Sequence, residues 1–427
     1  MQSEIAGDAP AHDAVMRCLW IGRYMPYPLD AGAKVYSARV AESLAATGAF
    51  VRFLGHGEAS ENAHAGIDWV AVPGARKGQF AGLFSRMPIA AAIDATPQYT
   101  TLLDAQLQEH WDVLVLDGYG TGWTLERCRR YAAQRRCVIV HVSHNHEEIL
   151  WRDMARHADE ALPKRIALWL NYRKVRALER RVVDAVDLVT AITAEDADAL
   201  NRSGKVRTLI LTPGYAGSVA AERRITAATP RRVILVGSFR WAVKQENLAR
   251  FLELADARLA ENGIGLDIVG DVPEELLASL RPRCRATTFH GFVEDTAPLL
   301  AQARIAVVPE LIGGGFKLKL LDYLFARVPI ATLAGAAAGL PPLLRDQLLQ
   351  ADDLDMLVKD IVSNIDAIDM LNEMQERAFR HAESLFRWED RGRQLRQAIA
   401  QIDRAERSGA PSQVQTLSVL NASHMKR

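Results

Sequence analysis

Short apolar runs alternate with amphipathic stretches along most of the chain. Runs typical of buried strands occur at residues 17–22, 50–54, 111–116, 137–142 and 188–192. Between them, apolar positions recur at helical spacing over residues 35–46, 125–135 and 194–200. A longer helical region, interrupted by Pro163, covers residues 147–183. Continuously apolar strands that alternate with helices predict a parallel sheet covered on both faces.

The periodicity stops after the first round and then begins again. Between Thr212 and Pro230, Pro, Gly, Ala and Thr predominate, as is typical of a linker. A second set of strands is predicted at residues 232–237, 266–270, 289–293, 305–309 and 329–332. Helices are predicted between them at residues 246–261, 298–302 and 317–326. The predicted fold class is therefore α/β, with two Rossmann-like domains that face each other across a cleft.

The length of the chain supports two domains, since 427 residues exceed what one compact core usually holds. The predicted division is listed from the N-terminus. It comprises a tail (1–13), a first Rossmann-like domain (14–211), a linker (212–230), a second Rossmann-like domain (231–375), a C-terminal helix (376–405) and a tail (406–427).

Charge and cysteine content exclude several classes of protein. Lysine plus arginine and aspartate plus glutamate number 52 each, so no whole-molecule charge attracts nucleic acid. The four cysteines are scattered without a Cys-x-x-Cys pair, which argues against a disulfide framework or a cysteine zinc site. The N-terminus lacks a signal-peptide pattern, and the longest uncharged apolar stretch, residues 328–344, is interrupted by Pro and Gly. We expect a cytoplasmic protein without a nucleic-acid partner.

The segment from Pro309 to Asp322 (PELIGGGFKLKLLD) carries the strongest chemical signal. Three glycines between a strand and a helix let the backbone approach a ligand, and a helix starting near Lys317 would present N–H groups to an anion. Lys319 would add positive charge one turn into that helix, and Asp322 could accept hydrogen bonds from sugar hydroxyls. A plain strand-to-helix turn with a surface lysine is the alternative for the glycines alone.

The sequence GGGFKLKLLDYLFARVPI resembles the donor-site signature of the retaining, family-4-like glycosyltransferases of the GT-B fold, the glycosyl transferases group 1. The resemblance implies that Gly314, Gly315 and Phe316 lie at the diphosphate of a nucleotide sugar. It also implies that Asp322 holds the ribose, at the second acidic position of a Glu-x7-Glu pattern. The first acidic position falls on Gly314, so half of that pattern is absent.

Two further segments resemble the same family in order and spacing. Residues 236–247 (VGSFRWAVKQEN) resemble the start of its C-terminal domain, and residues 291–295 (GFVED) resemble the part beside the nucleotide base. The implied donor-binding residues are Gly237, Ser238, the basic pair Arg240 and Lys244, and Phe292. For Phe292, a core aromatic is the alternative.

The N-terminal half resembles the acceptor side of these enzymes. Residues 26–34 resemble the family's first glycine loop, with Gly32 retained. Residues 141–148 (HVSHNHEE) follow a strand where members often carry an active-site histidine, which predicts His144 first and His146 second. A metal bound by His141, His144 and His146 is a weaker alternative, because no carboxylate or cysteine cluster in the sequence completes a site.

The resemblance implies transfer of a sugar from a nucleoside-diphosphate sugar to a glycan or lipid-linked acceptor, with retention and without a metal or cofactor. His144, Lys319 and Asp322 are the implied catalytic residues, and cell-surface polysaccharide or glycoconjugate synthesis is the implied setting. A same-fold sugar-nucleotide epimerase and a non-catalytic scaffold with a decayed donor site remain alternatives. A dehydrogenase is disfavoured because the first strand is not followed by Gly-x-Gly-x-x-Gly.

One helical region combines cations with aromatic residues. From Glu160 to Arg181 seven Lys and Arg residues stand against two Glu, and Trp169 lies among them. Residues 76–86 repeat the mixture. Such helices can lie on an anionic bilayer, so we expect a peripheral membrane contact. A solvated helix packed by one face on the sheet is the alternative.

Overall fold

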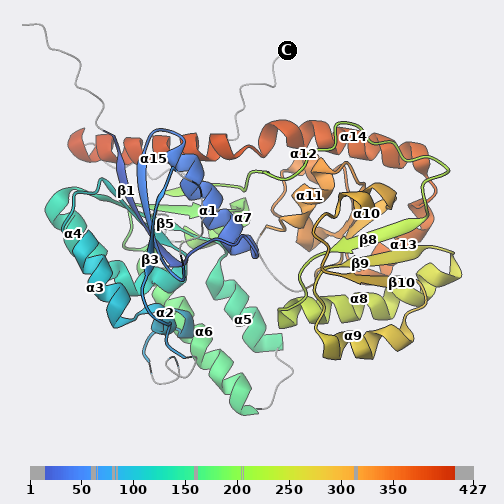
Figure 1. Cartoon of the computed structure of the whole chain (residues 1–427), viewed down its shortest axis with the longest axis horizontal. Coiled ribbons are helices and arrows are strands. Elements are labelled where there is room, and N and C mark those ends of the chain that lie inside the picture. Colours follow the sequence, from blue (N-terminus) through green and yellow to red (C-terminus); the bar gives the residue numbers. More distant parts are fainter. Residues whose placement is uncertain are drawn as a thin grey trace, which may run out of the picture.

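The computed structural model describes residues 15–58, 64, 66–78, 82, 85–157, 162–202, 204, 206–311 and 316–408. The glycines of the predicted donor loop, Gly313–Gly315, lie outside the described residues, as do both predicted tails. The chain forms two α/β halves that lie side by side (Figure 1), each built on one parallel sheet. The predicted fold class is confirmed.

The N-terminal sheet has seven strands in the order β3-β2-β1-β4-β5-β6-β7, all paired in parallel. They are β1 (Arg17–Tyr24), β2 (Phe50–His56), β3 (Asp68–Val72), β4 (Val113–Asp117), β5 (Val138–Val142), β6 (Leu188–Ala191) and β7 (Thr208–Ile210). Every residue of β4, β5 and β6 is buried, because helices cover both faces of the sheet. The strand order reverses between β1 and β4. In open α/β sheets, a crevice forms at the carboxyl ends of the strands where their order reverses.

The helices of this half are α1 (Gly32–Ala45), α2 (Ile89–Asp94), α3 (Pro97–Gln106), η2 (Tyr119–Thr124), α4 (Leu125–Arg135), α5 (Glu147–His157), α6 (Leu162–Val183) and α7 (Ala194–Leu200). Pro163 is the second residue of α6, a position where the missing N–H of proline breaks no helical hydrogen bond. The second half of α6 packs on the core through Val175, Leu178 and Val182. Its first turns project away from the sheet and form the lower tip of the molecule in Figure 1.

The C-terminal sheet has six parallel strands in the order β10-β9-β8-β11-β12-β13. They are β8 (Arg232–Val236), β9 (Gly265–Val269), β10 (Thr287–Gly291), β11 (Ile305–Val308), β12 (Ile330–Leu333) and β13 (Leu349–Ala351). The helices are α8 (Ala242–Glu261), α9 (Glu274–Leu280), η3 (Arg281–Arg283), α10 (Ala297–Gln302), α11 (Lys319–Phe325), η4 (Ala334–Ala337), α12 (Pro342–Arg345), α13 (Leu354–Asn364), α14 (Ile368–Leu385) and α15 (Trp388–Ser408). Here the strand order reverses between β8 and β11.

Two segments of chain connect the halves. Residues 211–231, all of them described, form neither helix nor strand. Helices α14 and α15 run along the top of both halves in Figure 1, and α15 packs against α1 of the N-terminal half. The two connections are bonded to each other, since the Tyr215 N–H donates to the Phe386 carbonyl at 2.8 Å and Arg391 donates to the carbonyls of Thr212 and Leu385.

Several element boundaries differ from those expected. Helix α11 begins at Lys319 and has seven residues, so the expectation of a helix starting near Lys317 is wrong. Helix α8 begins at Ala242, which places Lys244 in its first turn. Strand β10 ends at Gly291 and not at Val293, because this polar strand at the edge of the sheet lacks the apolar run that marks the central strands.

Candidate functional site

The reversal of strand order in the C-terminal sheet brings four charged side chains together. Glu310 lies just beyond β11, and its Oε1 is 2.8 Å from the Lys319 ammonium nitrogen, at the start of α11. Its Oε2 is 3.3 Å from the ammonium nitrogen of Lys317. Lys244, from the first turn of α8, lies close enough to influence the charges of all three. We call this group, Lys244, Lys317, Lys319 and Glu310, the lysine cluster.

Three of the four residues of the lysine cluster are largely shielded from water, and the cluster carries more cations than anions. The side chain of Glu310 is 8% exposed, and those of Lys317 and Lys319 are 11% and 12% exposed. Burial alone would raise the pKa of Glu310, but Lys319 and Lys317 lower it to about 2. Burial lowers the pKa of Lys317 and of Lys244, because removal from water disfavours their charged forms. An entering anion would therefore relieve this unfavourable concentration of positive charge.

Only some of the other residues expected to bind the donor lie beside the lysine cluster. A Cβ atom on Gly237 would lie 3.3 Å from the Lys319 ammonium nitrogen, so the backbone after β8 passes directly beside the cluster. Ser238 is exposed. Arg240 does not join the cluster, because its side chain is 77% exposed and pairs with Asp271 at 2.8 Å. Phe292 is 75% exposed, so the alternative that it is a core aromatic is wrong.

Asp322 lies one turn along α11 from Lys319. The residue keeps contact with solvent, but the protein atoms around its carboxylate raise its pKa to about 6 by desolvation. A hydrogen bond from Tyr215 and the charge of Lys319 oppose that shift. Tyr215 is itself fixed by stacking on Phe325, with ring centroids 4.2 Å apart. A polar ligand can therefore reach the carboxylate of Asp322.

Residues 316–318, which precede α11, lie where the two halves meet. A Cβ atom on Gly32, the first residue of α1, would lie 3.3 Å from Leu318. Phe316 packs against Phe386, with ring centroids 6.0 Å apart, and contributes to the hydrophobic cores of both halves. The structure therefore brings Gly32 opposite the start of α11, whereas Gly314 and Gly315 lie outside the described residues.

The reversal of strand order in the N-terminal sheet opens a second site, between the ends of β1 and β4. Its pocket is lined by Arg23, Tyr24, Ala33, Ser37, Asp117, Gly118, Tyr119, His144, Asn145 and Glu147. His144 Nε2 lies 2.6 Å from one oxygen of Asp117, and the other oxygen accepts a hydrogen bond from the Trp20 indole at 2.8 Å. Among the described residues, His144 has its hydrogen-bond partners at Nε2, which leaves Nδ1 for a ligand in the pocket.

The charges of this pocket differ from those of the lysine cluster. Burial raises the pKa of Glu147, against a hydrogen bond from Asn145. The guanidinium of Arg23 pairs with the buried carboxylate of Asp94 at 2.6 Å. Asp117 and Glu147 thus face the pocket without a matching excess of cations. Carboxylates, amides and phenols in such a space are suited to the hydroxyl groups of a sugar.

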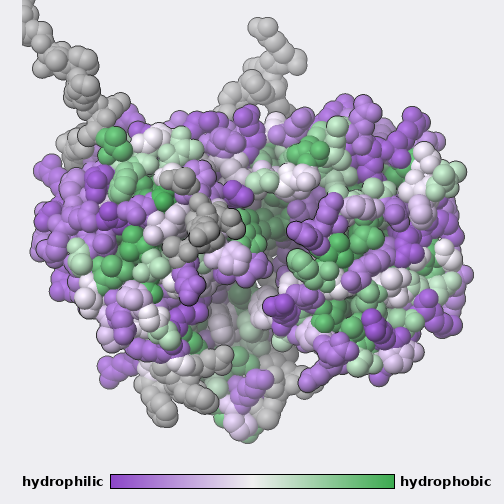
Figure 2. All heavy atoms as spheres, in the orientation of Figure 1, coloured by the Kyte–Doolittle hydropathy of each residue, from purple (hydrophilic) through white to green (hydrophobic). Residues whose placement is uncertain are grey.

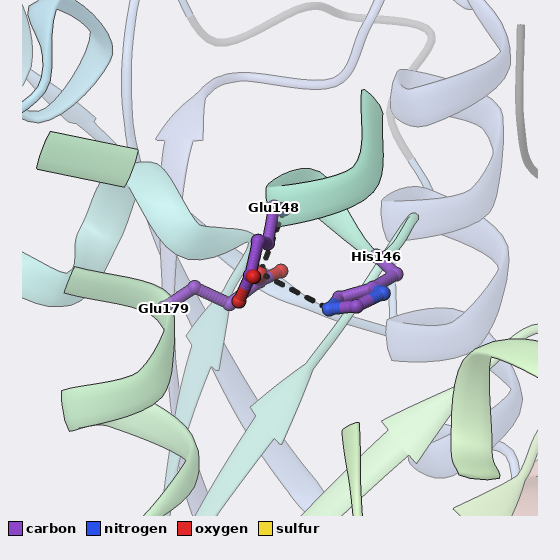
Figure 3. A group of neighbouring side chains, drawn as sticks. All are labelled: His146, Glu148 and Glu179. Carbon is purple, nitrogen blue, oxygen red and sulfur yellow. Dashed lines mark hydrogen bonds and ion pairs between the residues drawn. The ribbon is translucent and has the colours of Figure 1, made fainter. Parts of the chain in front are cut away.

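The three clustered histidines of the sequence have different surroundings. His141 is buried, hydrogen-bonds to the Leu116 carbonyl at 3.0 Å and has its pKa lowered by burial to about 4. His146 lies beside Glu148 and Glu179, with potential ligand atoms of all three within 4.8 Å of one another (Figure 3). The expectation that no carboxylate cluster accompanies these histidines is therefore wrong.

The chemistry of this group nevertheless does not suit a metal ion. The two oxygens of Glu179 accept the backbone N–H groups of Glu147 and Glu148, both at 2.8 Å. Glu148 is paired with three guanidinium groups at 2.9 to 3.5 Å, those of Arg180, Arg176 and Arg202. Both carboxylates are already engaged, and three nearby cations oppose a further positive ion. We interpret the group as the anchor that joins the start of α5 to α6.

Sequence reasoning proposed some of the residues that line the two candidate sites and did not propose others. Gly237 and His144 follow strands, whereas Lys244, Lys319 and Asp322 lie in the first turns of helices near the reversal in the C-terminal sheet. Missed were the roles of Glu310, Lys317 and Asp117. One signal was available for Glu310 and Asp117, because each is an acidic residue that ends or follows a continuously apolar strand at a reversal of strand order.

Comparison with known proteins supports the fold described above. Residues 230–371 match the family glycosyl transferases group 1. No curated protein sequence matches the chain significantly. Among solved structures, Anabaena HepE in complex with UDP and glucose superposes with a TM-score of 0.62 at 12% identity, covering 90% of this chain and 100% of HepE.

Two further structures cover nearly the whole chain. WaaG, a glycosyltransferase involved in lipopolysaccharide biosynthesis, has a TM-score of 0.57 at 16% identity, covering 91% of this chain and 99% of WaaG. A trehalose 6-phosphate synthase from Burkholderia multivorans has a TM-score of 0.62 at 11% identity, with 94% and 100% covered. The match to glycosyl transferases group 1 thus lies within the C-terminal half, and the chain has the GT-B fold of two Rossmann-like domains.

Proposed function

We propose that the protein is a retaining glycosyltransferase that moves a sugar from a nucleoside-diphosphate sugar to a glycan or lipid-linked acceptor. The observation that carries this proposal is the lysine cluster, which gathers three cations at the reversal of strand order in a glycosyl transferases group 1 domain. HepE, which shares the fold, is seen with UDP and glucose, so UDP-sugars are the first donors to consider. Synthesis of a cell-surface polysaccharide or glycoconjugate is the setting we favour.

The two sites suggest which residues would act on each part of the substrates. Cleavage of the bond between sugar and diphosphate leaves negative charge on the diphosphate, and preformed cations in a nearly dry site stabilise that charge strongly. Lys244, Lys317 and Lys319 supply these cations from the protein itself. Asp322 would accept hydrogen bonds from the donor ribose. His144, held by Asp117, would present Nδ1 to a sugar hydroxyl from the opposite domain.

A donor screen tests the proposal. The protein is incubated with glucose and N-acetylglucosamine nucleotides of uridine, guanosine and adenosine, with and without a mixture of lipid-linked and free glycan acceptors. We expect acceptor-dependent release of one nucleoside diphosphate, and NMR should show a product with the anomeric configuration of the donor. Conversion of a donor without acceptor would indicate an epimerase instead, and binding without any turnover would indicate a scaffold.

We further infer a peripheral contact with an anionic membrane, through the first turns of α6. Four large apolar side chains on one face of the helix are 49% to 67% exposed: Leu162, Ile166, Trp169 and Leu170. The Arg173 guanidinium lies 5.0 Å from the centroid of the Trp169 ring, so a cation borders this face. In Figure 2, the lower tip formed by these turns carries both hydrophobic and hydrophilic residues. No helix of the described residues is long and apolar enough to cross a bilayer.

Ion pairs within the protein reduce the number of cations available for the membrane contact. Arg176 and Arg180 pair with the buried Glu148, and Arg181 pairs with Glu126 at 2.6 Å. Glu160 lies outside the described residues, as do parts of residues 76–86. The membrane contact therefore rests on the apolar face and on the few cations beside it, each contributing about 1 kcal/mol at an anionic surface.

Liposome flotation tests this contact. The wild-type protein should float with vesicles that contain anionic lipid at low salt and remain unbound with neutral vesicles. The double variant Trp169→Ser, Leu170→Ser should lose most of that binding. Leu254→Ser, which changes an exposed leucine of the other half, is the matched control. If the wild-type protein ignores anionic vesicles, the face is structural and an acceptor free in solution is the better proposal.

A further inference from the structure

Glu310 is an unexpected residue at the centre of a site that should bind an anion. Its carboxylate lies between the ammonium groups of Lys317 and Lys319, and its side chain is 8% exposed. It follows the end of β11, which pairs with β8, so it lies at the carboxyl edge of the two central strands. A diphosphate that contacts these lysines must therefore approach a fixed negative charge.

The position of Glu310 has two opposing consequences. Before a ligand arrives, the carboxylate compensates cations that burial would otherwise make costly. Asp196, in α7 of the opposite half, adds a second negative charge near Lys317. Once a ligand is bound, the same carboxylate competes with its phosphate oxygens for the two ammonium groups. The site therefore binds an anion less tightly than the three lysines alone would.

We propose that Glu310 limits the affinity of the lysine cluster for the nucleoside diphosphate that leaves the reaction, and so promotes product release. The reason is a difference in charge. A terminal phosphate loses its second proton with a pKa of about 6, so near neutral pH a free nucleoside diphosphate carries about one more negative charge than the nucleotide sugar. Repulsion from Glu310 consequently acts more strongly on the product than on the donor.

The proposal rests on the proposed function, because it concerns the same donor site. It differs from a purely supporting role, in which Glu310 would only hold the lysines in place. In that case loss of the carboxylate would weaken binding of product and donor together. If Glu310 instead contacted the transferred sugar, its loss would weaken only the donor. The ratio of the two affinities therefore separates the three roles.

The test is Glu310→Gln, titrated calorimetrically with UDP, GDP and ADP and with the glucose nucleotide of each. We expect the Kd of the preferred nucleoside diphosphate to fall about tenfold, that of its glucose nucleotide to fall less, and the salt dependence of product binding to steepen. With an active donor, kcat should fall while product inhibition strengthens. Glu310→Asp, which keeps the charge, should remain near the wild type.

Two controls make the result decisive. Asp355→Asn makes the same change of net charge at a carboxylate that is 57% exposed and paired with Arg258, and it should leave both affinities unchanged. Circular dichroism of Glu310→Gln should show the wild-type fold. A well-folded Glu310→Gln protein with an unchanged or lower affinity for the nucleoside diphosphate overturns the role of Glu310. A wild-type protein that binds none of the six nucleotides overturns the donor site as a whole, and the role of Glu310 with it.

Discussion

The two reversals of strand order in this molecule have the same geometry and opposite chemistry. In each half, two neighbouring parallel strands end side by side at the point where the order of the strands reverses. These strands are β1 and β4 in one half, and β8 and β11 in the other. The C-terminal crevice gathers three lysines round one glutamate. The N-terminal crevice gathers Asp117 and Glu147 with His144 and two tyrosines.

This difference shows how one architecture provides two kinds of binding site. The backbone supplies only a crevice at the carboxyl ends of the strands, and the side chains that follow the strands decide which ligand is favoured. Excess positive charge favours a diphosphate, and carboxylates beside a histidine favour hydroxyl groups. The interpretation predicts that variants in the two crevices will change different steps, and four experiments test that division.

The largest effect is expected from Lys319→Ala and Asp322→Ala in the C-terminal crevice. Hydrogen bonds to charged groups contribute about 1.5–3 kcal/mol each, so each variant should lose about tenfold to a hundredfold in kcat/KM for the donor. Lys359→Ala, at an exposed lysine of α13, is the matched control. Two well-folded variants with normal kcat/KM would show that the lysine cluster is not the donor site.

A smaller and different effect is expected from His144→Ala in the N-terminal crevice. Its loss should lower kcat about tenfold, whereas the affinity for the nucleoside diphosphate should remain that of the wild type, because the lysine cluster is untouched. Asp117→Asn should act in the same direction, since Asp117 orients the ring. If His144→Ala weakens nucleoside diphosphate binding as much as Lys319→Ala does, the two crevices are not separate in function.

The pH dependence should sharpen the assignment of Asp322. Its pKa is raised to about 6, so the carboxylate is largely protonated at pH 5 and largely ionised at pH 7. Because only the ionised form accepts hydrogen bonds at both oxygens, kcat/KM for the donor should rise as the pH increases through about 6. The acid limb should disappear in Asp322→Asn, which cannot titrate. An unchanged limb in that variant would assign the titration to another group.

Chelation should have no effect on the reaction. The lysine cluster supplies the positive charge that a divalent ion would otherwise bring to a diphosphate, and the carboxylates beside His146 are engaged by backbone N–H groups and by arginines. Initial rates with and without EDTA should therefore agree. Loss of activity that a divalent ion restores would contradict this prediction and would make His146, Glu148 and Glu179 the first residues to mutate.

Much of the fold was predictable because the central strands are apolar at nearly every position. The runs at residues 111–116 and 137–142 correspond to β4 and β5, whose residues are all buried. Strands β3, β7 and β13 lie at sheet edges and were not predicted, because each is a short run of only five, three and three residues. The start of α11 was misplaced because Lys317 and Leu318 continue an apparently helical pattern that the chain does not follow.

The sequence by itself determined which residues are candidates for the chemistry of the donor side. A strand, three glycines, two lysines and an aspartate follow one another closely between Pro309 and Asp322, so a local pattern and its resemblance to a known family were enough to propose Lys319 and Asp322. His144 was proposed because it comes two residues after a buried strand, at a place where members of that family often carry a histidine.

Only the tertiary structure decided which of those residues meet, and with what partners. Lys244 is far from Lys319 in sequence, and they act on one another because β8 and β11 are neighbours in the sheet. Asp117 and His144 are 27 positions apart in the sequence, and the pairing of β4 with β5 likewise brings them together. Charges act through space and not along the chain, so the balance of lysines and glutamate in one crevice, and of carboxylates in the other, followed from the order of the strands.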